Sequence, residues 1–163
     1  MYSKFQYVAN DTSVVDFLPT APDPNGWFAL KEVAYTIDGR AVDRPKMEAN
    51  GSWAVFNYYS LMHIECSGDL IANTSALFNV FKQTAVQKLM PAPESLQTDR
   101  TQGAIVMRML GFSEDYSVPV VVETPFNAPA QGASPSLSPF RVVFKAFRPY
   151  FFGLSSSEYF WVG

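Results

Sequence analysis

The side chains best suited to chemistry are a histidine and a cysteine in one apolar segment. His63 is the single histidine of the chain and Cys66 the single cysteine. Any scheme in which a histidine activates a serine or cysteine nucleophile must therefore use His63. In an extended strand His63 and Glu65 share a face while Cys66 points to the other face, so the three side chains do not converge. We interpret His63 as a strand-face residue and Cys66 as a small buried residue.

Paired acidic residues are the other candidates for acid–base chemistry. Glu114 precedes Asp115 directly, and Asp11 lies near Asp16, but both pairs fall in segments typical of solvated turns. Phosphate-binding, dinucleotide-binding, zinc-hydrolase and nucleophile-elbow motifs do not occur in the sequence. One cysteine and one histidine do not form a disulfide or a metal site by themselves. We therefore predict a protein that is not an enzyme and needs no cofactor or metal.

The composition argues for assembly with other protein subunits. Of the 163 residues, 48% are hydrophobic, 15% aromatic and only 17% charged, whereas about 25% of an average soluble protein is charged. The net charge of −3 and the absence of a basic cluster argue against nucleic-acid binding. Neither a signal peptide nor a long apolar span occurs, so we expect no membrane contact and synthesis in the cytoplasm. Aromatic residues are enriched at interfaces, and we expect a homo-oligomer.

One helix is predicted between strands. Leu77, Phe78, Phe81, Ala85, Val86 and Leu89 recur at helical spacing and form one apolar stripe. Asn73, Thr74 or Ser75 is a suitable cap, and Pro91 ends the helix, which we place at residues 73–90.

The remaining regular segments have the composition of strands. Alternating or continuous runs of β-branched and aromatic residues predict them at 4–8, 14–18, 27–36, 53–66, 103–111, 118–123 and 140–147. Asp38-Gly39 is a typical two-residue hairpin turn, which makes 40–49 the second arm of a hairpin and, because of Pro45, an edge strand. Asn50-Gly51 predicts another turn, and residues 67–69 are expected to end the strand before them. The apolar terminus at 159–162 is expected to pair or pack.

The predicted fold class is mainly β (α+β): a β-sandwich with one amphipathic α-helix and extended arms. Residues 54–150 form its β-rich centre, and we expect residues 1–163 to be a single domain. Three segments with turn or proline-rich composition, 19–26, 38–51 and 124–139, are candidate arms that contact neighbouring subunits. The candidate interface residues are Pro22, Pro24, Trp27, Asp38, Gly39, Pro45, Phe126, Pro135, Tyr150, Phe160 and Trp161.

One family resemblance follows from the order of these elements and from residues 141–153. That segment ends in Arg148-Pro149-Tyr150-Phe151-Phe152-Gly153 and is similar to the late strand and Asp-Pro-Tyr-Phe-Tyr-Gly-like ending of bacteriophage distal tail proteins. Residues 54–153 resemble the amino-terminal domain of that family. The chain departs from the pattern at Arg148, where the family often has Asp, and it ends before a carboxy-terminal carbohydrate-binding-like domain, as a minimal hub would.

The resemblance implies a structural protein of the virion tail. In that family the domain is a β-sandwich with a helix, and its copies form a hexameric ring that joins the tail tube to the baseplate or tip. The arms would then be the belt between subunits. Three alternatives stay open: a tail tube or head–tail connector subunit, a carbohydrate- or receptor-binding β module that uses Trp27, Trp53 and Tyr58, and a small hydrolase that uses His63.

Overall fold

The structure is a computed structural model that describes residues 1–45, 52–91, 101–128, 136–156 and 158–161, with the side chains of residues 40–60 and 161 outside the description. Its elements in chain order are β1 (Tyr2–Ala9), β2 (Val14–Asp16), β3 (Trp27–Pro45), β4 (Ser52–Ile71), α1 (Ser75–Lys88), β5 (Gly103–Met109), β6 (Tyr116–Asn127), β7 (Leu137–Ala146), β8 (Tyr150–Gly153) and β9 (Tyr159–Trp161).

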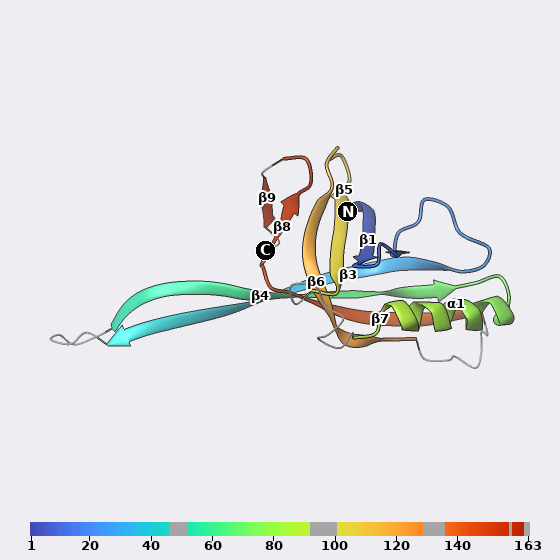
Figure 1. The fold of residues 1–163 in the computed structure, drawn as a ribbon, viewed down its shortest axis with the longest axis horizontal. Helices are drawn as coiled ribbons and strands as arrows, with labels where there is room; N and C mark the ends of the chain where they lie inside the picture. The colour runs from blue at the N-terminus through green and yellow to red at the C-terminus, as the bar shows by residue number, and fades with distance from the viewer. Residues whose placement is uncertain (46–51, 92–100, 129–135, 157, 162–163) are drawn as a thin grey trace.

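The strands form one antiparallel sheet that folds over on itself. Its order is β2-β1-β5-β6-β7-β4-β3, with β8 paired to β6 and β9 paired to β8. The fold occurs in β6, whose first part pairs with β5 and whose second part pairs with β7. Strands β1, β5 and the start of β6 therefore run across β3, β4 and β7 (Figure 1). The two ends of the sheet meet where the Leu30 N–H donates to the Phe17 carbonyl at 3.1 Å.

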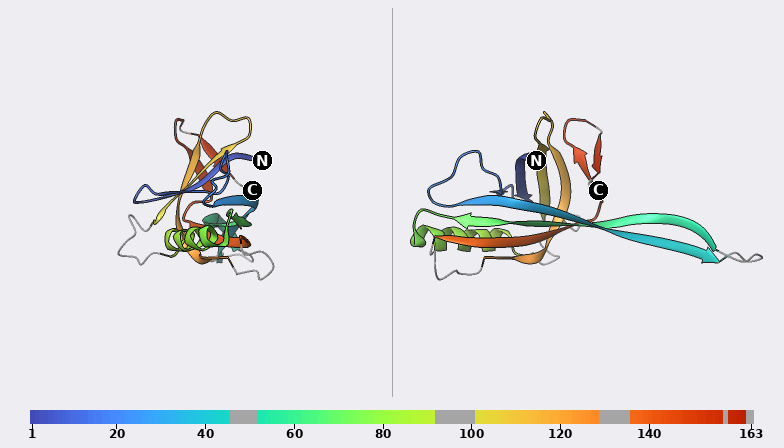
Figure 2. Two further views of the ribbon diagram at one scale, coloured as in Figure 1. Left: turned by 90° about the vertical axis from the view of Figure 1, so that its right-hand side faces the viewer. Right: turned by 180° about the vertical axis from the view of Figure 1, so that it is seen from behind.

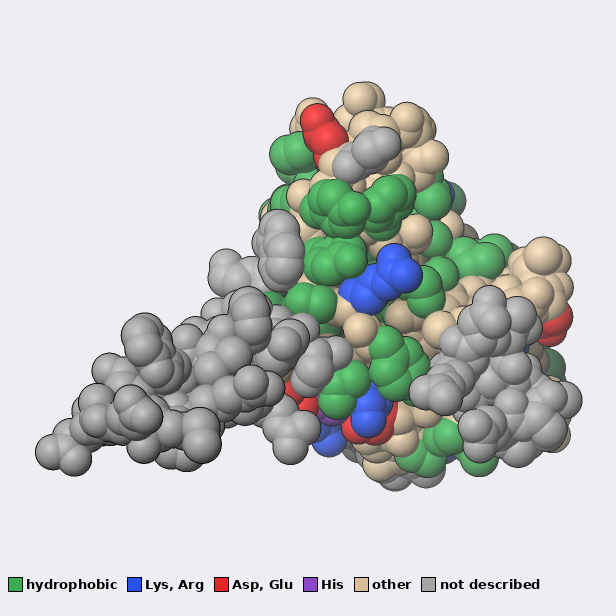
Figure 3. All heavy atoms as spheres, turned by 60° about the vertical axis from the view of Figure 1, so that its left-hand side comes forward, with side chains coloured by type: hydrophobic (Ala, Val, Ile, Leu, Met, Phe, Trp, Pro, Cys, Tyr) green, Lys and Arg blue, Asp and Glu red, His purple; other side chains and the backbone are tan. Residues whose placement is uncertain are grey.

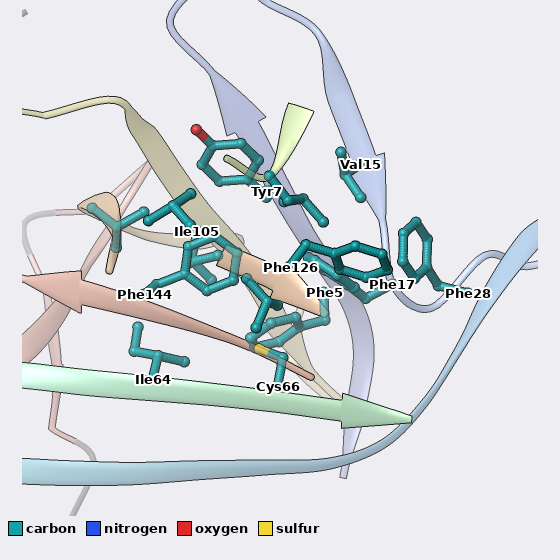
Figure 4. Packing of buried hydrophobic residues seen from close by; sticks show 14 of the residues in the cluster. Phe5, Tyr7, Val15, Phe17, Phe28, Ile64, Cys66, Ile105, Phe126 and Phe144 are labelled. Atoms are coloured by element: carbon teal, nitrogen blue, oxygen red, sulfur yellow. The ribbon is translucent and has the colours of Figure 1, made fainter. Parts of the chain in front are cut away.

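An aromatic cluster fills the space inside the folded sheet. Phe17, directly after β2, contacts Phe28 of β3 at a ring-centroid distance of 5.1 Å and Phe140 of β7 at 5.9 Å. Tyr7 of β1 stacks on Phe144 of β7 at 5.2 Å. These side chains point toward one another from strands that are distant in the sheet order (Figure 4). Their burial supplies the main driving force that keeps the sheet folded.

Helix α1 confirms the predicted helix and its apolar stripe. Thr74 caps it by accepting a hydrogen bond from the Leu77 N–H at 3.2 Å. Phe78, Ala85 and Leu89 are buried, and the Phe81 ring contacts Phe28 at 5.3 Å. The helix lies along β7 (Figures 1 and 2) and covers one side of the core.

The predicted turn at Asp38-Gly39 is wrong. β3 continues through both residues to Pro45, and the register with β4 shifts between Asp38 and Gly39. A glycine within a strand often marks such a bulge rather than a turn. The second arm predicted at 40–49 is therefore the continuation of β3 as far as Pro45, at the edge of the sheet. The Asn50-Gly51 turn lies outside the described residues.

Residues 67–69 do not end the preceding strand. β4 runs on to Ile71, and Gly68 pairs with Leu30 of β3. A Cβ atom at Gly68 would lie 2.1 Å from the Ala29 carbonyl oxygen. Position 68 therefore requires a glycine, because β3 and β4 approach each other closely there.

The connection predicted at 124–139 is shorter than expected. β6 extends to Asn127 and β7 begins at Leu137, so both ends of the segment are strand. Pro125 and Pro139 are tolerated there, although proline donates no ladder hydrogen bond. Residues 129–135, including Pro135, lie outside the described residues. Over the described residues the prediction of a mainly β fold with one helix is confirmed, and the strands belong to one continuous antiparallel sheet that folds over on itself.

We predict that Gly68→Ala destabilises the fold by about 3 kcal/mol or more, because the added methyl group meets backbone atoms of a paired strand that cannot rotate away. Urea unfolding measures the difference. The control is Thr36→Ala at an exposed position of β3, for which we expect a change within about 0.5 kcal/mol. Equal unfolding midpoints for the two variants would contradict the steric explanation.

Candidate assembly surfaces

A two-stranded ribbon is the most prominent surface feature. β4 pairs with β7 only from Met62 to Ile71, whereas residues 52–61 of β4 pair only with β3 among the described strands. Residues 39–45 and 52–61 therefore form a ribbon, called the β-ribbon below, which extends beyond the rest of the described chain (Figure 1). At about 3.3 Å per residue it is roughly 30 Å long.

The β-ribbon has the composition of a segment that becomes covered. Its β4 part contains Trp53, Phe56, Tyr58 and Tyr59, and its β3 part ends at Pro45. An isolated two-stranded hairpin is at best marginally stable in water, because it has no third strand or helix to cover it.

A second surface is an apolar tip formed by two turns. Leu110 and Phe112, in the turn between β5 and β6, are 64% and 51% exposed, and Leu154, after β8, is 60% exposed. Tyr159 of β9 is also exposed and packs edge-on against Phe152 at 5.1 Å. Figure 3 shows hydrophobic side chains gathered on the part of the molecule that stands above β3 and β4.

Glu114 holds the two turns of the apolar tip together. One carboxylate oxygen accepts hydrogen bonds from the backbone N–H groups of Ser155 at 2.8 Å and Ser156 at 2.6 Å, and the other accepts from the Ser156 hydroxyl at 2.8 Å. The Leu154 N–H also donates to the Asp115 carbonyl. The bond from the Ser156 side chain, followed by the backbone bonds, lowers the pKa of Glu114.

A cleft of about 240 Å³ lies between α1, β2 and the loop that joins β2 to β3. Asp23 lines it from the loop, Trp27 from the start of β3 and Lys88 from α1. Pro22 and Pro24 are exposed on the same loop, so the 19–26 segment lies on the surface beside the cleft. Trp27 is the one described side chain of the three aromatic residues named for a carbohydrate site.

The other candidate interface residues fall into three groups. Asp38 and Gly39 are exposed where the β-ribbon begins, and Pro45 ends its first strand. Tyr150 and Phe160 lie half-buried in the β8–β9 pair, where the backbone of Trp161 pairs with Tyr150.

The third group is one residue, Phe126, which is buried in the core of its own chain. Its ring stacks on Phe140 at 5.9 Å, so this side chain is not exposed for contact with a neighbour.

The apolar tip was missed by the sequence prediction. The available signal was a large apolar residue directly after a glycine, as in Gly111-Phe112 and Gly153-Leu154. A turn with such residues has no interior position in which to bury them.

The residues considered for nucleophilic chemistry do not converge. Cys66 is fully buried, and burial raises the pKa of its thiol. His63, on the opposite face of β4, contacts Glu123 of β6 and Asp38 of β3. Glu65 pairs instead with Arg141 of β7 through both carboxylate oxygens. The sequence predicted the opposite orientations of His63 and Cys66, but not the two carboxylates beside His63.

The adjacent acidic residues are both engaged within the chain. Asp115 accepts hydrogen bonds from Lys4 at 2.8 Å and Arg108 at 2.7 Å. Burial raises the pKa of Asp115, but these two cations and their hydrogen bonds outweigh it, so the net shift is downward. Glu114 accepts hydrogen bonds from the turn at residues 155–156. Both acidic side chains are therefore held by contacts within the chain.

Neither a metal-binding cluster nor a membrane-spanning helix is found in the described ranges. Within them, no cluster of three or more His, Cys, Asp or Glu side chains has the arrangement needed to hold a metal ion. None of the helices that the structure describes has the length and apolar character needed to cross a membrane.

Comparisons with known proteins include a distant structural similarity. No protein-family model matches the chain, and no curated protein sequence matches it. A solved structure described as "Tail of empty GTA particle computed with helical refinement, C6 symmetry" is similar with a TM-score of 0.39 and 6% sequence identity, over 82% of each chain. A similarity at this level assigns neither a family nor a function.

We predict that Glu114→Ala opens the turn at residues 154–156 without unfolding the sheet. The Ser155 and Ser156 amides should exchange hydrogen faster, because they lose their acceptor. Hydrogen-exchange mass spectrometry or NMR measures this change. In the unchanged chain, protection should be present above the ordinary glutamate pKa of about 4.3 and be lost as the pH falls through the lowered folded-state pKa.

The matched control is Glu158→Ala, which removes an exposed carboxylate from the same turn. This variant should keep the exchange rates of the unchanged chain at Ser155 and Ser156. Equal acceleration in both variants would contradict the role given to Glu114.

Proposed function

We propose that this chain is a structural protein of a bacteriophage virion, a ring-forming subunit of the tail hub that links the tail tube to the baseplate or tip. The observation that carries the proposal is the β-ribbon, because residues 52–61 extend past β7 and pair only with β3 among the described strands. The proposed ring is a homohexamer, without chemistry of its own and located in the tail of the virion.

The β-ribbon favours contact with an adjacent copy. Each edge of a two-stranded ribbon presents backbone donors and acceptors that no described strand of the chain satisfies. Its paired backbone also extends away from the strands that enclose the core of this chain (Figure 1). Both needs are met if the β-ribbon packs on the body of the next subunit.

A contact of this kind is head-to-tail. The surface that gives the β-ribbon differs from the surface that receives it, so the interface is heterologous. Heterologous contacts close into a ring when the rotation between subunits divides a full turn, and otherwise they continue as a filament. The proposed function requires the closed case.

The position of the ring within the tail is proposed from residues 141–153. Their similarity to the distal tail family favours a hub over a tail tube subunit. The apolar tip, with Leu110, Phe112 and Leu154 exposed at its two turns, is the surface that we assign to the neighbouring tail proteins above or below the ring. A tail tube subunit would use the same surface to stack identical rings.

We predict that removal of the β-ribbon abolishes ring formation while the body still folds. In the shortened variant an Asn-Gly pair replaces residues 39–60 and joins Asp38 to Leu61, which are partners in the ladder and which this turn type can connect. The full chain should form rings at high concentration, and the shortened chain should be a monomer with an unchanged far-ultraviolet circular dichroism spectrum per retained residue. Native mass spectrometry and negative-stain electron microscopy measure the assembly.

The control is the double variant Phe112→Ser and Leu154→Ser, which changes the apolar tip and leaves the β-ribbon intact. We expect this variant to keep the single ring. A full chain that stays monomeric at high concentration, or a shortened chain that still forms rings, would overturn the proposal. Long stacked tubes from the full chain would favour the tail tube alternative.

A further inference from the structure

His63 lies where the β-ribbon leaves the body of the molecule. It is next to Met62, the first residue of β4 in chain order that pairs with β7. Asp38 lies opposite Leu61 at the register shift where the β-ribbon begins. Glu123 lies in β6, at a second register shift between Val122 and Thr124. One imidazole therefore joins the root of the β-ribbon to a strand of the body.

The geometry of the imidazole requires two donors. His63 Nδ1 is 2.6 Å from Glu123 Oε2, and His63 Nε2 is 3.2 Å from Asp38 Oδ2. An ionised carboxylate only accepts hydrogen bonds, so each ring nitrogen must carry a proton to make both bonds. Both nitrogens are protonated only in the imidazolium cation. With both carboxylates ionised, the two contacts can therefore be hydrogen bonds at the same time only in the charged histidine.

Three other charged residues lie near this pair of bonds. Lys145 of β7 lies opposite His63 in the ladder. Glu65, two residues further along β4, is neutralised by Arg141 of β7. Of the described acidic side chains, Asp38 and Glu123 are thus the two with oxygens in bonding contact with the ring.

Loss of the proton breaks one of the two bonds. A neutral imidazole has one N–H and one lone pair, and the shorter contact at Nδ1 retains the hydrogen for Glu123. The Nε2 lone pair would then face an Asp38 oxygen, which is repulsive. The Asp38 side chain is 52% exposed, so it can turn away into solvent. The start of the β-ribbon then loses its hydrogen bond to His63.

We propose that His63 is a proton-dependent latch that fixes the direction of the β-ribbon relative to the body of the chain. The latch is closed when the imidazolium bonds to both Glu123 and Asp38, and it opens when the ring is neutral. Closing it restricts motion about the register shift between Asp38 and Gly39. The latch belongs to the single chain and does not depend on ring formation.

The hydrogen bond to Glu123, followed by the bond to Asp38 and the charges of both, raises the pKa of His63 despite the opposing effect of its burial. A histidine with a raised folded-state pKa stabilises the fold below its unfolded pKa of about 6.5, and this contribution is lost as the pH rises through the folded-state value. The latch is therefore closed on the acid side and opens toward alkaline pH.

The test measures the distance between two spin labels, one on the body and one on the β-ribbon, by double electron–electron resonance spectroscopy in monomeric samples. Spin labels are placed at Val80→Cys on the exposed face of α1 and at Arg44→Cys near the far end of the β-ribbon. Cys66 is fully buried and is not expected to react with the label. We expect a narrow distance distribution at about pH 5.5 and a broader one at about pH 8.5, on either side of the histidine transition.

Variants separate the latch from a general effect of pH. Asp38→Asn and His63→Gln should give the broad distribution at both pH values. Lys31→Gln, which breaks a different β3–β4 ion pair with Asp69, should keep the narrow distribution on the acid side and its broadening on the alkaline side.

The single histidine also allows an independent measurement, because its imidazole signals in a nuclear magnetic resonance spectrum need no assignment. We expect its pKa to lie above about 6.5 and to fall toward that value in Glu123→Gln. A pKa of the unchanged chain at or below about 6.5 would overturn the proposal. So would a distance distribution that does not change across the titration, or one that changes equally in His63→Gln.

Discussion

Closure of the sheet by the Phe17 ring is the interaction on which the rest of the structure depends. Phe17 lies directly after β2, a strand of three residues at one end of the sheet, and its ring contacts Phe28 of β3 at the other end. The adjacent backbone bond from Leu30 joins the same two ends. The sheet is closed at this point, so its two outer strands are held together around the core. The β-ribbon begins elsewhere, where β7 ends at Ala146 opposite Met62 and leaves β4 paired with β3 alone.

The helix and most strands could be predicted because their side chains divide between inside and outside in a regular period. The stripe through Phe78, Ala85 and Leu89 identified α1 within two residues at each end. Turns were harder to predict, because a glycine allows several backbone conformations. Asp38-Gly39 and Gly68 both have the composition of a turn, yet both lie within strands, since the need for a bulge or a close approach arises only from the partner strand.

The candidate surfaces were predicted less completely, since exposure depends on tertiary contacts. Phe126 follows a proline in a segment of loop-like composition, but β6 continues through it and turns its ring into the core. Leu110 and Leu154 resemble core residues in the sequence, but their turns extend past the end of the core. The partners of His63 come from β3 and β6, which lie 25 and 60 residues away in the chain. Periodicity within one segment does not report such pairings.

Several of the few charged side chains of this chain are neutralised in ion pairs. Asp115 is neutralised by Lys4 and Arg108, and Glu65 by Arg141. The exposed Glu65–Arg141 pair adds little stability, but together these pairs reduce the number of uncompensated charges on the body. The β-ribbon and the apolar tip are different surfaces, and neither is covered by the described part of its own chain. The proposed head-to-tail ring requires two unlike uncovered surfaces on one chain, because its contacts join non-equivalent patches of successive copies.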